Sequence, residues 1–208
     1  VYQQFIELVA DRAEHIVTGD GLESGVTMGP IVDSSQRDTV LEYIKQGQAE
    51  GATLLLDGSS PSRPALRDGY FVEPTVVLTS NPHFKLMEEE IFAPVLTLFV
   101  YDDRDFEATL ALCDSTSPYA LTGAIFARDR AVIRRMATAL RHAAGNFSIN
   151  DKPTGAVVGQ QPFGGARASG TNDKAGAAAN LMRWTSMRTM KETFVSPREV
   201  GYPHMAEE

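Results

Sequence analysis

The sequence predicts an α/β fold, with a mostly parallel sheet that carries helices on both of its faces. Segments with the periodicity of amphipathic helices alternate with short apolar segments typical of strands. The helical segments are long enough to serve as crossovers between neighbouring parallel strands. Because 43% of the 208 residues are hydrophobic, the chain can also bury a substantial core.

The first half of the chain begins with two expected helices. Phe5 and Leu8 fall on one face of the first helix, and Asp33 and Ser34 are typical N-terminal caps for the second, which ends at Gly51. A loop rich in Ser, Pro and Gly occupies residues 57–69. The expected elements up to residue 101 are a helix at 2–17, the capped helix up to 51, and strands at 52–56, 71–78 and 94–101.

The second half repeats the alternation and then changes character. We expect a helix at 103–115, a strand at 122–127, a helix at 129–143 and a strand at 146–150. Residues 184–195 instead mix apolar and charged side chains, partly with period two. This pattern predicts a strand that pairs at an exposed edge, and the alternative is a frayed terminus lying on its own domain.

Composition excludes several classes of function. The net charge of −8 argues against nucleic acid or an anionic membrane surface as a partner. No run reaches the roughly 18 apolar residues of a membrane-spanning helix. A single cysteine excludes an internal disulfide and any cysteine cluster for a metal, and the four histidines lack metal-ligand spacing.

That cysteine, Cys113, invites interpretation as a nucleophile. However, Phe106, Leu110 and Cys113 share one face of an expected helix. The spacing therefore predicts a buried structural thiol.

The segment 151–174 is the most unusual part of the chain. Lys152, Arg167 and Lys174 surround it, and no acidic residue lies between Asp151 and Asp173. Its glycines suit positive φ angles and close approach of a ligand, and consecutive free amides attract anions. These glycines are Gly155, Gly159, Gly164, Gly165 and Gly170. The residues alone also allow a plain solvent loop that uses glycine only to turn.

The strand ending in Asn150 and the following Pro-Phe-Gly-Gly sequence at 162–165 resemble the C-terminal signature of the aldehyde dehydrogenase superfamily. Over residues 149–174 the pattern is similar to the branch that oxidises glutamate γ-semialdehyde, or 1-pyrroline-5-carboxylate, in proline degradation. Two residues elsewhere, Ala93 and Ala120, depart from the superfamily pattern, which usually has glycine at these positions. Further blocks resembling the superfamily lie at 27–33, 43–51, 69–75, 88–95 and 116–123.

The resemblance implies roles for five residues. Glu90 would accept hydrogen bonds from the nicotinamide ribose hydroxyls of NAD, and Phe92 would pack beside the nicotinamide. The amides of Gly155 and Ala156 would bind the substrate's α-carboxylate, while Phe163 packs on its aliphatic part. On the residues alone, Glu88–Glu90 is better explained as a solvated acidic surface.

The resemblance also implies that this sequence is one part of a longer protein. We expect the dinucleotide-binding domain and the nucleophilic cysteine upstream of Val1, so the 208 residues alone are expected to be inactive. Residues 1–183 would belong to the catalytic domain, and 184–208 would form an oligomerisation strand, at 184–195, and a tail. The intact protein would be a homo-oligomer of the cytoplasm, or of the mitochondrial matrix in a eukaryote. Another semialdehyde dehydrogenase, or a non-catalytic interaction module, remains an alternative.

Overall fold

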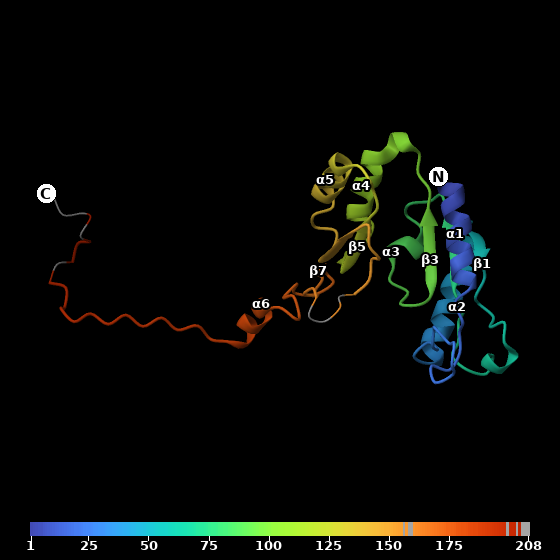
Figure 1. Cartoon of the computed structure of the whole chain (residues 1–208), viewed down its shortest axis with the longest axis horizontal. Helices are drawn as coiled ribbons and strands as arrows, with labels where there is room; N and C mark the ends of the chain where they lie inside the picture. Colours follow the sequence, from blue (N-terminus) through green and yellow to red (C-terminus); the bar gives the residue numbers. More distant parts are fainter. Residues whose placement is uncertain (156, 158–159, 199, 203, 205–208) are drawn as a thin grey trace.

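The computed structural model describes residues 1–155, 157, 160–198, 200–202 and 204. Two packed regions, each around its own hydrophobic cluster, are followed by a C-terminal segment that extends away from both (Figure 1). The first region is built on a three-stranded sheet, and the second on a two-stranded parallel sheet.

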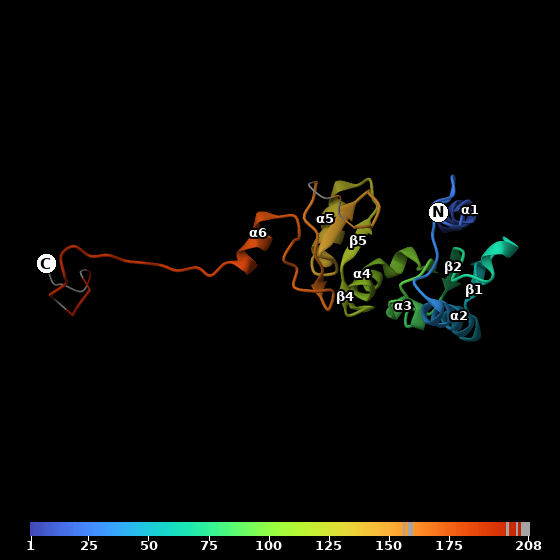
Figure 2. The same cartoon turned by 90° about the horizontal axis from the view of Figure 1, so that it is seen from below.

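The three-stranded sheet has the order β1-β2-β3 and lies between two helices. The strands pair antiparallel between β1 and β2 and parallel between β2 and β3. Figure 2 shows α1 and α2 on opposite sides of this sheet. The elements are α1 (Tyr2–Glu14), α2 (Ser34–Ala49), β1 (Thr53–Leu56), β2 (Thr75–Thr79) and β3 (Val95–Phe99).

The helix α2 forms where the sequence predicts it. Asp33 caps its N-terminus by accepting a hydrogen bond from the Gln36 amide at 2.8 Å. Val40 and Ile44 then point into a core shared with Val77 of β2. Phe84, which is fully buried, joins the same cluster from the connection between β2 and β3.

The second region centres on a crossover unit. The parallel strands β5 (Thr122–Ile125) and β6 (Asn146–Ile149) are joined through α5 (Arg130–Ala139), and α4 (Phe106–Ser115) packs beside α5. The buried residues of this core are Leu110, Ile125, Ile133 and Leu140. The remaining strands, β4 (Tyr119–Ala120) and β7 (Ala166–Arg167), form a short antiparallel pair.

Short helical elements complete the chain. They are η1 (Pro64–Leu66), α3 (Lys85–Glu88), η2 (Asp103–Asp105), α6 (Ala178–Leu181) and η3 (Met182–Trp184).

The predicted α/β class and the order of the longer elements are confirmed, but the strands do not form one mostly parallel sheet. Within the described residues they form three small sheets, with two parallel and two antiparallel pairings. The connection between β1 and β2 contains only the three-residue helix η1. Without a long crossover helix, β2 returns antiparallel beside β1.

Residues 185–198 contain no helix or strand in the structure. Met187 and Phe194 in this segment, and Trp184 just before it, are almost fully exposed. A strand needs a neighbour for its backbone amides and carbonyls, and no such neighbour lies beside this segment in the single chain (Figure 1). Across the described residues, no helix is both long and apolar enough to span a membrane, and no cluster of side chains is suited to a metal ion.

Candidate functional site

The acidic run Glu88–Glu90 lies where α3 ends and the chain turns toward β3. Glu90 is exposed, and with its neighbours it lines one wall of a cleft of about 300 Å³. The opposite wall comes from Ser117 and the segment 119–122. The carboxylate of Glu90 has no hydrogen-bond partner among the described residues, so it is available to a ligand in this cleft.

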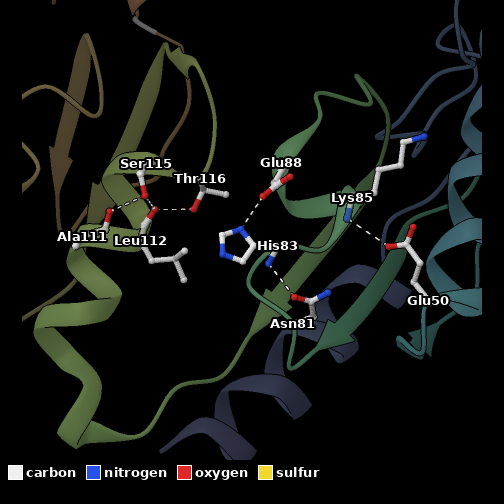
Figure 3. A network of polar contacts seen from close by, with 9 residues as sticks. All are labelled: Glu50, Asn81, His83, Lys85, Glu88, Ala111, Leu112, Ser115 and Thr116. Atoms are coloured by element: carbon white, nitrogen blue, oxygen red, sulfur yellow. Dashed lines mark hydrogen bonds and ion pairs between the residues drawn. The ribbon is translucent and has the colours of Figure 1, made fainter.

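The other two acids of the run have partners. His83 Nδ1 lies 2.9 Å from a carboxylate oxygen of Glu88, and the His83 amide donates to Asn81 (Figure 3). Glu89 accepts a hydrogen bond from the hydroxyl of Tyr43. This bond is the main reason why the pKa of Tyr43 is raised above its ordinary value. The run is therefore not a uniform solvated surface.

Phe92 projects outward from the same segment. Its side chain is 85% exposed, and its backbone has a φ of 56°, in the left-handed region that a bulky residue rarely adopts. The preceding residue, Ile91, is buried. The backbone thus turns sharply after Ile91, which leaves an aromatic ring free for contact with another group.

The structure brings Gly155 and Phe163 together. A Cβ atom built on Gly155 would lie 3.9 Å from the ring of Phe163, an ordinary van der Waals distance. Phe163 is half-buried and forms a bridge with Ala175, with its amide 2.9 Å from the Ala175 carbonyl oxygen. Ala156, the third residue of the predicted substrate site, lies outside the described residues, as does Gly159.

The loop that carries Phe163 is held against β6 by Asn146. This buried amide donates to the carbonyl oxygen of Pro162 at 3.1 Å and accepts from the Gly164 amide at 3.2 Å. Sequence reasoning placed Asn146 in a strand but gave its side chain no role. A polar residue at the start of a strand was the available signal, since a buried amide requires partners.

Two of the three cations around this loop are paired within the chain itself. Arg167 pairs with Asp114 at 2.6 Å, and Lys174 donates to the carbonyl oxygens of Gly145 and Gly164. Lys152 has no side-chain partner in the part of the chain that the structure describes. Among the described residues, Lys152 and the backbone amides are therefore the groups left to bind an anion.

One loop glycine has the predicted positive φ, and another is required by close packing. Among the four described, only Gly170 has a positive φ. Gly165 is required because a Cβ there would lie 2.5 Å from the Cβ of Ser169. The glycine-rich composition therefore reflects tight packing of the loop on its own chain as much as access for a ligand.

The predicted burial of Cys113 is wrong. The residue is exposed, because it lies in the last turn of α4, beyond the contacts that Leu110 makes with the core. Desolvation by neighbouring atoms nevertheless raises the pKa of the thiol. A raised pKa lowers the fraction of nucleophilic thiolate, so this environment does not activate Cys113.

Comparison with known proteins identifies the family. The sequence profile described as "Aldehyde dehydrogenase family" matches residues 1–190. This chain belongs to the aldehyde dehydrogenase family. The expected family blocks, including the acidic run and the Pro-Phe-Gly-Gly loop, fall within the matched residues.

Two curated relatives and one solved structure are pyrroline-5-carboxylate dehydrogenases. The chain is 53% identical to the mitochondrial delta-1-pyrroline-5-carboxylate dehydrogenase of Dictyostelium discoideum over 84% of its length, and 43% identical to that of Danio rerio over 99%. A crystal structure of the delta-pyrroline-5-carboxylate dehydrogenase from Mycobacterium tuberculosis covers 100% of the chain at 41% identity, with a TM-score of 0.78.

These relatives are longer than this chain. The chain covers 31% and 37% of the two curated relatives and 37% of the crystallised chain. A second structure of the M. tuberculosis enzyme, described as bound with NAD, matches with a TM-score of 0.78.

Proposed function

We propose that this chain forms the C-terminal part of the catalytic domain of an NAD-dependent dehydrogenase that oxidises L-glutamate γ-semialdehyde to L-glutamate. Family membership and the shared name of the relatives support the reaction class. Because the chain spans about a third of those relatives, the proposal concerns the full-length protein that contains it.

The observation that carries the substrate proposal is the position of Gly155 beside the ring of Phe163, where a Cβ atom added to the glycine would lie 3.9 Å from the ring. The amides of Gly155 and Ala156 would donate hydrogen bonds to the α-carboxylate of the substrate, and the ring of Phe163 would pack against its methylene groups. An aldehyde that carries its own carboxylate fits both halves of this site. A hydrogen bond to a charged group contributes about 1.5–3 kcal/mol, enough to select such a substrate over a neutral aldehyde.

Glu90 and Phe92 are the proposed cofactor contacts. The carboxylate of Glu90 is unpaired within the described structure and lines the cleft, which suits an acceptor for two ribose hydroxyls. The ring of Phe92 is free to lie against a planar nicotinamide. NAD, when bound, supplies the hydride acceptor, and the role of these two residues is to orient it.

We further propose that residues 184–195 form an oligomerisation strand in a homo-oligomer. Their exposed Trp184, Met187 and Phe194 would be covered by a neighbouring subunit, which would also pair with the backbone. Residues 1–183 would then form one part of the catalytic domain, with the present sheets joined into a larger, mostly parallel one. The proposed location is the cytoplasm, or the mitochondrial matrix in a eukaryote, as the names of the eukaryotic relatives suggest.

The experiment is a substitution at Gly155 in the full-length protein. Alanine fits at this position, because its Cβ would lie at an ordinary distance from Phe163, whereas the branched side chain of Gly155→Val would crowd the amides. We expect Gly155→Val to raise KM for glutamate semialdehyde at least tenfold and to change KM for a short uncharged aldehyde little. Gly155→Ala is the matched control.

Three results would reject the proposal in different ways. A wild-type preference for uncharged aldehydes would indicate another aldehyde dehydrogenase. If Gly155→Val changed KM equally for glutamate semialdehyde and for the uncharged aldehyde, the substrate carboxylate would not bind at this loop. Absence of NADH formation with every aldehyde would favour a non-catalytic module.

A further inference from the structure

The residues on both sides of Glu90 are bound by one helix. Tyr43 donates its hydroxyl to the carboxylate of Glu89, and Gln36 donates its side-chain amide to the carbonyl oxygen of Ile91 at 2.7 Å. Tyr43 and Gln36 are seven residues apart on α2, so they lie two turns apart on the same face. The chain is thus fixed immediately before and immediately after Glu90.

The helix that makes these contacts is itself firmly placed. Ile44, next to Tyr43, is buried in the cluster that contains Phe84. Lys85 lies 4.8 Å from the centre of the Tyr43 ring and donates to the side chain of Gln46 at 3.0 Å. The Lys85 amide also lies near Glu50, at 3.4 Å (Figure 3). Tyr43 therefore has little freedom to move away from Glu89.

The segment between α3 and β3 needs such support. α3 ends at Glu88, and β3 begins at Val95, so Glu90 is not part of a helix or strand that would fix its direction. His83 holds only Glu88, from within the same connection. A binding group outside regular structure is oriented by the bonds that its neighbours make.

We propose that Tyr43 and Gln36 are positioning residues for cofactor binding, which hold the backbone on both sides of Glu90 so that its carboxylate stays in the cleft. This inference rests on the proposed role of Glu90. It explains why a tyrosine hydroxyl is bonded to an acid at a partly exposed position, where such a bond adds little to stability.

The test is a double-mutant cycle between Tyr43→Phe and Glu90→Gln in the full-length enzyme. We expect Tyr43→Phe to raise KM for NAD about fivefold, since one hydrogen bond of about 1 kcal/mol is lost, with KM for the aldehyde unchanged. In the Glu90→Gln background, Tyr43→Phe should have no further effect on KM for NAD. Gln36→Leu should behave in the same way and provides an independent variant.

The matched control is Tyr101→Phe, which removes a hydroxyl that has no hydrogen-bond partner in the described part of the chain. If Glu90→Gln alone leaves NAD kinetics unchanged, the proposed role of Glu90 fails, and the inference fails with it. If Glu90→Gln impairs NAD kinetics but Tyr43→Phe and Gln36→Leu do not, only the inference fails. If Tyr43→Phe and Gln36→Leu raise KM for NAD and KM for the aldehyde equally, and their effects add to that of Glu90→Gln, the two residues have only a structural role. That result would also overturn the inference.

Discussion

Replacing Gly145 by alanine tests how the loop that carries Phe163 is fastened to β6. The Cβ of alanine would overlap the carbonyl oxygen of Gly164 and lie 2.9 Å from the Cα of Gly165. Both obstacles are backbone atoms, so no rotation of a side chain can relieve the overlap. The loop would have to move away from the start of β6.

That movement breaks identifiable contacts. Asn146 would lose its bonds to Pro162 and to the Gly164 amide, which measure 3.1 and 3.2 Å. Lys174 would lose at least one of its carbonyl partners. With about 1 kcal/mol for each of the two neutral bonds and about 1.5–3 kcal/mol for the charged one, Gly145→Ala should weaken the docking of the loop by about 3.5–5 kcal/mol.

Amide hydrogen exchange at Phe163 and Gly164, together with urea unfolding, measures this cost. We expect exchange at both amides to accelerate by about 2.5–3.5 orders of magnitude, since each 1.4 kcal/mol is a factor of about ten. Gly155→Ala is the control in the same region, because its Cβ would be 3.9 Å from the nearest atoms. If the amides of Phe163 and Gly164 exchange at the same rate in Gly145→Ala and Gly155→Ala, the close approach of the chain at Gly145 does not hold the loop, which would refute this prediction.

Two further predictions concern the segment around Glu90. Because the backbone φ of Phe92 is 56°, the Phe92→Gly variant should have a free energy of unfolding about 1 kcal/mol higher than that of Phe92→Ala, the reverse of the usual order. Urea unfolding measures this difference. A Phe92→Ala variant as stable as Phe92→Gly, or more stable, would contradict the strained backbone. The raised pKa of Tyr43 means that its bond to Glu89 contributes fully below the unfolded tyrosine pKa, near 10, and is lost as pH rises through the higher folded value. Wild type should therefore lose stability relative to Tyr43→Phe only above about pH 10, and a difference that is constant from pH 8 to 11 would refute this coupling.

Local signals in the sequence were sufficient for most helices and strands. Asp33 and Asp129 both cap the helices that they were expected to begin, with Asp129 accepting from two amides of α5. The crossover from β5 through α5 to β6 could be predicted from the spacing of the apolar residues and the lengths of the three segments. The predicted strand at 71–78 begins later, at Thr75, because the residues before it form the end of a loop whose Glu73 amide bonds to Gly58.

Long-range pairing was not accessible in the same way. The charges of Arg167 and Lys174 marked the loop as a candidate anion site, but their partners, Asp114 and the carbonyl of Gly145, lie 53 and 29 residues away. Likewise, a glycine-rich sequence is compatible with a backbone that is accessible to a ligand and with a backbone that packs closely against its own chain. The resemblance to a family supplied the pairing of Gly155 with Phe163, which no local pattern could have given.

The acidic run shows how tertiary contacts divide residues that are alike in sequence. Glu88, Glu89 and Glu90 have the same side chain and adjacent positions, yet the first is bound by His83, the second by Tyr43, and the third lines the cleft without a partner in the described structure. The two that are bound restrict the backbone on which the third depends. It follows that a substitution at Tyr43, 46 residues before Glu89, should alter NAD kinetics although every proposed ligand-binding residue is unchanged.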